Sequence, residues 1–142
     1  MQPAHPRPAM PALPLPDDDT ERLLLVALRR MACHGIRDAH AANLFVCRFG
    51  VRFRAPLVLI RAFMVDLAQV SRRAIMISPC CALRMTEDEA RLIAALRLAG
   101  IEPAESARHL NALAGTAAIG RALSTAMAFS GALVAGGVLP PI

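Results

Sequence analysis

Apolar residues recur every three or four positions through most of this chain, and glycine or proline stands near the end of each such stretch. Between residues 20 and 34, Leu24, Leu28 and Met31 fall on one helical stripe, whereas Arg29 lies largely off it. This spacing is typical of helices that turn one face toward a core. It predicts helices at residues 20–34, 38–49, 56–73, 87–99, 103–114 and 117–135. We therefore expect an all-α protein, a compact bundle of five to six helices.

Three of the predicted helices carry further signals. Asp38 is expected to be the N-cap of the helix that runs to about Phe49. Thr86 and Glu89 have the spacing of a capping box, in which each side chain binds the backbone N–H of the other residue. The stretch 56–73 is apolar nearly all round, so we expect it to be the most buried helix of the bundle. Arg72 and Arg73 would then lie at its C-terminal end, where the helix dipole favours cations.

The first residues of the chain differ in composition from the rest. Six prolines lie within residues 1–16, and each one removes a backbone donor and fixes φ. This composition predicts a disordered, proline-rich tail over residues 1–18 without regular hydrogen-bonded structure. The remaining length, residues 19–138, fits a single helical domain that needs no disulfide or metal to bury a core.

Charge is distributed unevenly along the 142 residues. All sixteen basic residues are arginines. Residues 1–21 carry a net charge of −3 and residues 74–142 a net charge of 0, whereas residues 22–73 hold ten arginines and two aspartates, a net charge of +8. Arginine binds phosphate and carboxylate groups through a planar fork of donors, so this segment predicts a surface for anions.

Five arginines of the basic segment are candidates for binding an anion or nucleic acid. Three bracket the turn between two predicted helices and two end the second of these helices: Arg48, Arg52, Arg54, Arg72 and Arg73. The two helices and their short link superficially fit a helix-turn-helix, but the stretch 56–73 is too apolar to lie exposed in a DNA groove. A solvated arginine face without a ligand is the competing interpretation.

Cysteine supplies the second set of candidates. Cys80 and Cys81 are adjacent in a loop between two predicted helices, and Cys33 and His34 lie at the end of the first helix. Across the fold these four residues would form a site for zinc or another soft metal, or a reactive thiol pair. The competing interpretation is that the cysteines only pack as small apolar residues. We expect the second helix to shield Cys47 at least partly.

Four cysteines without regular spacing and an N-terminus without an apolar signal core predict the reducing cytoplasm. Residues 122–139 carry no charge, but eighteen residues rich in alanine and glycine are short for a membrane span. We expect a buried or dimer-forming helix, so that self-association through the helix at 117–135 is favoured over a membrane contact.

The chain carries no nucleophile elbow and no phosphate-binding loop, so catalysis finds little support in it. Three segments, RDAHAANLFVCRFG, APLVLIRAFMVDLAQVSRR and ISPCCALRMTEDEARLIAAL, together resemble a family of short, uncharacterised alphaproteobacterial proteins known only as a domain of unknown function. The resemblance covers about residues 20–100. In that family the cysteine loop can hold a third cysteine and a second proline, where this chain has Ala82 and Leu83. The resemblance implies a bacterial source and no mechanism.

These patterns together predict a small cytoplasmic helical protein that acts by binding. The leading hypothesis is a binding or regulatory module with an arginine-rich face, whose partner is a protein or nucleic acid. The alternative is a thiol- or metal-dependent sensor centred on Cys80 and Cys81.

Overall fold

The computed structural model describes residues 11–137. In this range the chain forms six α-helices: α1 (Asp19–His34), α2 (Ala39–Phe49), α3 (Arg54–Val70), α4 (Glu87–Leu98), α5 (Pro103–Ala114) and α6 (Gly120–Ala135). A 3-10 helix, η1 (Gly50–Arg52), joins α2 to α3. Two strands of two residues each, β1 (Leu13–Pro14) and β2 (Arg84–Met85), pair in antiparallel fashion. The predicted all-α bundle is confirmed.

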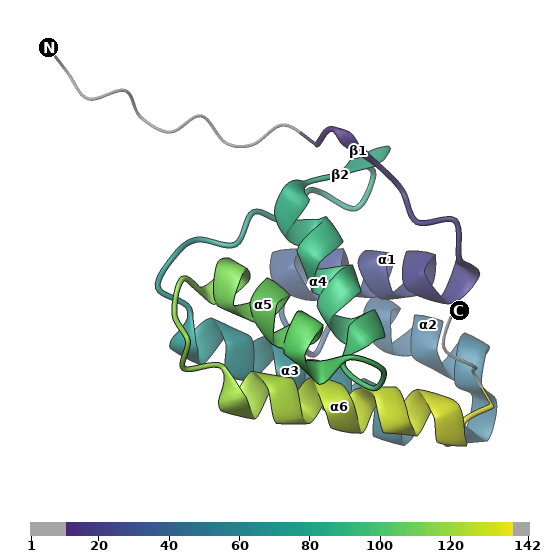
Figure 1. Cartoon of the computed structure of the whole chain (residues 1–142). Helices are drawn as coiled ribbons and strands as arrows, with labels where there is room; N and C mark the ends of the chain where they lie inside the picture. Colours follow the sequence, from purple (N-terminus) through teal and green to yellow (C-terminus); the bar gives the residue numbers. More distant parts are fainter. Residues whose placement is uncertain (1–10, 138–142) are drawn as a thin grey trace, which may run out of the picture.

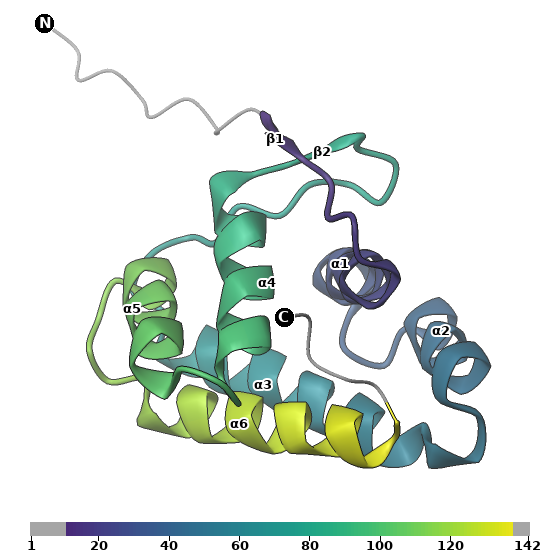
Figure 2. The ribbon, with the colours of Figure 1, turned by 45° about the vertical axis from the view of Figure 1, so that its right-hand side comes forward.

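The helices pack as pairs around one core. α6 lies along α3, α4 packs against α5, and α1 packs against α2 (Figure 1 and Figure 2). Contacts of α4 with both α1 and α6 join the pairs. Phe45, Phe63 and Phe129, from α2, α3 and α6, have no exposed surface, and alanines such as Ala95 and Ala126 fill the close contacts between helices. The core therefore needs little aromatic bulk.

Local capping fixes several helix ends as predicted. The Thr86 hydroxyl accepts a hydrogen bond from Glu89 N at 3.0 Å, and Glu89 Oε1 accepts one from Thr86 N at 2.9 Å, so the capping box at the start of α4 is confirmed. Asp38 caps α2 by accepting from Ala41 N at 2.9 Å. Gly115 ends α5 with a φ of 68°, a left-handed conformation that side chains rarely adopt.

Two expectations about α3 are wrong. The helix ends at Val70, because Ser71 is extended and Arg72 N donates to Ala114 O at 2.7 Å, which turns the chain toward the end of α5. Arg72 and Arg73 therefore lie beyond the helix. Only five of the seventeen residues of α3 are buried, against six of twelve in α4, so α3 is not the most buried helix.

The expectation that residues 1–16 contain no regular hydrogen-bonded structure is wrong at residues 12–14. Leu13 is paired with Met85, Pro14 is paired with Arg84, and Ala12 N donates to Met85 O at 3.0 Å. Proline is tolerated in a two-stranded ribbon because an edge position does not require its missing donor. The predictions for residues 1–10, and for residue 138 at the domain boundary, lie outside the described residues.

The helix predicted at residues 117–135 begins three residues later, at Gly120. It turns Ala122, Ala126 and Phe129 into the core, whereas Met127 remains 43% exposed. Within residues 11–137, no helix has both the length and the apolar character that crossing a bilayer requires.

Candidate functional site

Most arginines of the basic segment bind other parts of the same molecule. Seven of the ten arginines in residues 22–73 use their side chains in hydrogen bonds within the fold: Arg22, Arg29, Arg30, Arg48, Arg52, Arg61 and Arg73. Several of these bonds end on backbone carbonyls that no helix or strand satisfies, in loops and at helix C-termini. Much of the +8 charge therefore serves the architecture.

The five arginines predicted to bind an anion lie in two separate places. Arg48, Arg52 and Arg54 lie around the junction of α2 and α3, whereas Arg72 and Arg73 follow the far end of α3. A helix of seventeen residues is about 25 Å long, so the two groups do not form one continuous face. Arg73 is also occupied, because it pairs with Asp88 at 3.1 Å and donates to Leu113 O at 3.0 Å.

At the α2–α3 junction the three arginines differ in what they bind. Arg52 Nη1 donates to Ala135 O at 2.7 Å and so holds the C-terminal end of α6. Arg48 donates to the Thr20 hydroxyl at 3.3 Å and lies 5.7 Å from the centre of the Phe49 ring. The exposed Arg54 side chain makes no hydrogen bond to any residue that the structure describes. Among the three, Arg54 is thus the arginine whose donors are not used by any described residue.

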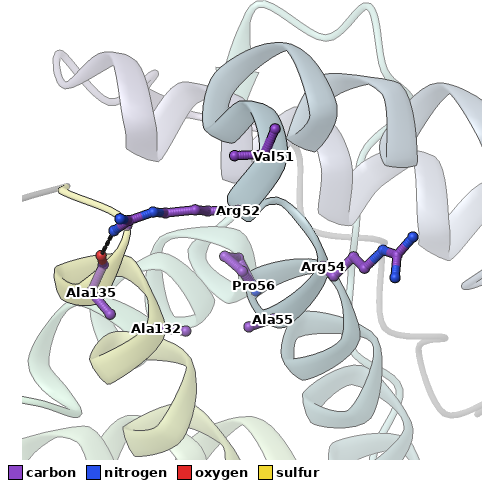
Figure 3. A pocket seen from close by; sticks show the side chains of 8 residues that line it. Val51, Arg52, Arg54, Ala55, Pro56, Ala132 and Ala135 are labelled. Carbon is purple, nitrogen blue, oxygen red and sulfur yellow. Dashed lines mark hydrogen bonds between the residues drawn. The ribbon is translucent and has the colours of Figure 1, made fainter.

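Arg52 and Arg54 border an open groove of about 300 Å³ between the α2–α3 junction and the end of α6, which we call the junction groove. Its lining is Val51, Arg52, Arg54, Ala55, Pro56, Ala132, Ala135 and Gly136. Figure 3 shows Arg52 reaching across to Ala135, with Pro56 and Ala55 between Arg52 and Arg54. Val51 is 96% exposed, and no carboxylate lines the groove. The groove therefore combines an apolar floor with positive charge.

The loop with the adjacent cysteines, residues 78–85, is held by a buried ion pair that the sequence did not predict. Arg29 was expected to lie off the apolar stripe of α1, but it is only 2% exposed. Its guanidinium binds both carboxylate oxygens of Glu89, at 2.6 and 3.1 Å. It also donates to the loop carbonyls of Ala82 and Arg84 at 2.8 and 2.9 Å. The loop conformation therefore depends on α1.

Glu89 completes this network, which we call the Arg29–Glu89 network. Its carboxylate accepts hydrogen bonds from Thr86 N and Ser78 N as well as from Arg29. Burial opposes ionisation of Glu89, but the hydrogen bonds from Arg29 and Thr86 N outweigh that effect and lower its pKa. Glu89 is therefore ionised at neutral pH and carries the counter-charge to Arg29.

Near its end, α1 is joined to the start of α2 through Arg30. Arg30 binds Asp38 with two hydrogen bonds of 3.0 Å. These bonds, followed by the N–H of Ala41, lower the pKa of Asp38 to about 2. Asp38 in turn raises the pKa of Arg30 by accepting its hydrogen bonds.

The four predicted metal or thiol residues differ in exposure. Cys33, His34 and Cys81 are exposed, and Cys80 is half-buried. No group of three or more His, Cys, Asp or Glu side chains in residues 11–137 is arranged to hold a metal ion. The zinc site that was one alternative for these residues therefore finds no ligand set in the described part of the chain. Cys47 is exposed, so the expectation that α2 shields it is wrong.

Comparison with known proteins gives a family. A model of a family of unknown function, DUF6628, matches residues 3–136. The chain belongs to DUF6628. This membership confirms the expected domain of unknown function, whereas the alphaproteobacterial source stays a prediction. No curated protein and no solved structure matched the chain. A function for this DUF6628 member must therefore be inferred from its own residues.

Three features of this DUF6628 protein were not predicted from its sequence: the exposure of Val51, the partners of Arg29, and the contact of Arg52 with α6. The Arg29–Glu89 pair joins residues 60 positions apart, which no local pattern reveals. A signal for the junction groove was present, because residues 39–65 and 106–137, which supply both of its walls, contain no aspartate or glutamate.

Proposed function

We propose that the protein is an interaction module that binds a protein partner through the junction groove. The observation that carries the proposal is the exposure of Val51 at the rim of this groove. A single exposed valine is ordinary on a protein surface. Val51 differs because its 96% exposed side chain stands beside a concave apolar lining, where a partner side chain would bury both surfaces.

The geometry favours a protein over nucleic acid as the partner. A nucleic-acid surface needs several arginines that follow the phosphates of one strand or groove. Here the candidate arginines are divided between the two ends of α3, and Arg48 and Arg73 already have partners in the fold. An apolar hollow with few charges is instead typical of the core of a protein interface.

The thiol- or metal-dependent sensor has less support. The Arg29–Glu89 network fixes the loop backbone, and the described residues offer no metal ligand set around Cys80 and Cys81. Self-association through α6 rests on exposed residues such as Met127 and on the small side chains near it. We treat both as outcomes of the experiment below.

The test places the photoreactive residue benzoylphenylalanine at position 51 in the full chain, in living bacteria. The matched control is position 83, because Leu83 is 83% exposed but lies in the cysteine loop and does not line the groove. A third variant carries the same group at position 127 on α6.

We expect irradiation to give a discrete protein adduct from position 51 that position 83 does not give. The adduct should resist nuclease and be degraded by protease. Three results would each overturn the proposal. They are identical adduct patterns from positions 51 and 83, an adduct that nuclease removes, and a two-chain adduct formed at position 127 alone. The last result would assign association to α6.

A further inference from the structure

We infer that the partner segment recognised by the junction groove is an acidic peptide with an aliphatic residue between two carboxylates. This inference rests on the proposed function and adds the chemistry of the ligand. It follows from three features of the groove, which are its charge, its apolar floor and the positions of its two arginines.

The groove has a one-sided charge. Both of its walls come from segments without an acidic residue, residues 39–65 and 106–137. Two arginines of these segments, Arg52 and Arg54, line the groove. A ligand that enters this groove therefore meets guanidinium groups and no competing carboxylate in the lining, which favours an anionic partner.

The floor of the groove selects an aliphatic side chain. Ala55, Pro56 and Ala132 present small apolar surfaces, and Val51 adds an exposed apolar rim. A volume of about 300 Å³ lies at the lower limit of ligand pockets and accommodates one side chain of leucine size with its backbone. A polar side chain placed there would lose water without gaining a partner.

The two lining arginines lie on opposite sides of that floor. In Figure 3, Arg52 extends toward α6 and Arg54 extends the other way, with Pro56 and Ala55 between them. Arg52 uses one of its five N–H groups on Ala135 O, and the exposed Arg54 side chain makes no hydrogen bond within residues 11–137. A peptide that crosses the floor thus has an arginine available at each side, so that carboxylates flanking one aliphatic residue match the site.

The experiment titrates the ¹⁵N-labelled full chain with the blocked peptide Glu-Glu-Leu-Glu-Glu and follows backbone amide shifts. Two peptides test the two parts of the inference, because Gln-Gln-Leu-Gln-Gln lacks the charges and Glu-Glu-Gly-Glu-Glu lacks the aliphatic side chain. A short oligothymidylate tests whether negative charge alone is sufficient.

We expect the acidic leucine peptide to shift the amides of Val51, Ala132 and Ala135, and to bind about tenfold more tightly than either control peptide. Arg54→Gln should weaken this binding about tenfold. Arg72→Gln is the matched control, since Arg72 is also exposed and makes no side-chain hydrogen bond to the described residues, yet lies beyond the other end of α3. It should leave the affinity unchanged.

Four results would each overturn the inference. The first two are amide shifts located outside the groove and equal binding of the three peptides. The others are equal losses of affinity for the two variants, and oligothymidylate that binds in the groove as tightly as the acidic leucine peptide. Failure of the inference and failure of the proposed function are distinguishable. If position 51 still gives a protein adduct that Arg54→Gln does not reduce, the groove binds a partner of different chemistry. If position 51 gives no adduct, the proposed function itself fails.

Discussion

Replacing Arg29 with methionine tests how far the Arg29–Glu89 network stabilises the fold. The substitution keeps a long unbranched side chain in α1 but removes four hydrogen bonds, two to Glu89 and one each to Ala82 O and Arg84 O. It also leaves the Glu89 carboxylate, which is only 1% exposed, without its counter-ion. Removing one partner of a buried ion pair costs about 3–5 kcal/mol in general. We expect a loss of that size in the free energy of unfolding.

The loss should not greatly exceed this range, because other groups compensate in part. Thr86 N and Ser78 N continue to donate to Glu89, and the two loop carbonyls can reach water when the loop relaxes. A marginally stable domain has a free energy of unfolding of about 5–15 kcal/mol. The Arg29→Met variant should therefore either fold with a measurable stability or be close to unfolding. Arg29→Lys should restore little, since one ammonium cannot reach three acceptors in a plane.

Urea unfolding followed by far-ultraviolet circular dichroism measures the effect, because the chain has no tryptophan or tyrosine for fluorescence. The matched control is Arg108→Met, whose ion pair with Glu105 is on the surface, with the two side chains 78% and 44% exposed. It should cost less than about 1 kcal/mol. The reasoning is refuted if Arg29→Met costs no more than Arg108→Met, or if a double-mutant cycle with Glu89→Gln gives no coupling.

Three further predictions concern Glu89, the β1–β2 pairing and Cys80. Because the folded-state pKa of Glu89 is lowered, ionised Glu89 stabilises the fold above its unfolded pKa, and this stabilisation is lost as pH falls through the folded pKa. The difference in the free energy of unfolding between wild type and Glu89→Gln should therefore narrow below about pH 4.5. A pH-independent difference in urea unfolding would contradict this. Deleting residues 2–16 removes β1 and should lower the melting temperature by several degrees. Deleting residues 2–10 keeps the β1–β2 pairing and should lower the melting temperature less. Equal effects of the two deletions in a thermal melt would show that β1 does not contribute to stability. Cys80, the half-buried cysteine, should react with a thiol reagent more slowly than the other three cysteines. Arg29→Met should make the reaction of Cys80 faster. If mass-spectrometric labelling finds Cys47 to be the slowest, exposure does not control the rate.

The features that the sequence predicted correctly are those whose partners lie within a few residues. The capping box at Thr86 and Glu89 joins groups three positions apart, and the Asp38 cap joins groups equally close. Both depend on side-chain oxygens that accept from the first turn of a helix, which is a strictly local interaction. The helix positions followed from apolar spacing for the same reason.

The features that the sequence did not predict depend on distant contacts. Arg29 is charged, so its position was assigned to the solvent side of α1, and only the buried carboxylate of Glu89 reverses that assignment. The end of α3 was placed too late because Arg72 N bonds to Ala114 O, a contact between the segment after α3 and the end of α5 that follows from packing. The arginine-rich face rested on a net charge counted along the chain, which does not reveal that Arg48, Arg52 and Arg73 use their side chains in hydrogen bonds within the fold.

The dependence of the cysteine loop on Arg29 also decides which reagents can recognise it. A synthetic peptide of residues 76–90 contains Glu89 and the carbonyls of Ala82 and Arg84, but it lacks the guanidinium that joins them in the folded chain. Such a peptide has no reason to adopt the native loop in solution. An antibody raised against it would therefore bind the denatured chain on a blot far better than the native protein, so immunological detection of the folded loop requires the whole domain as antigen.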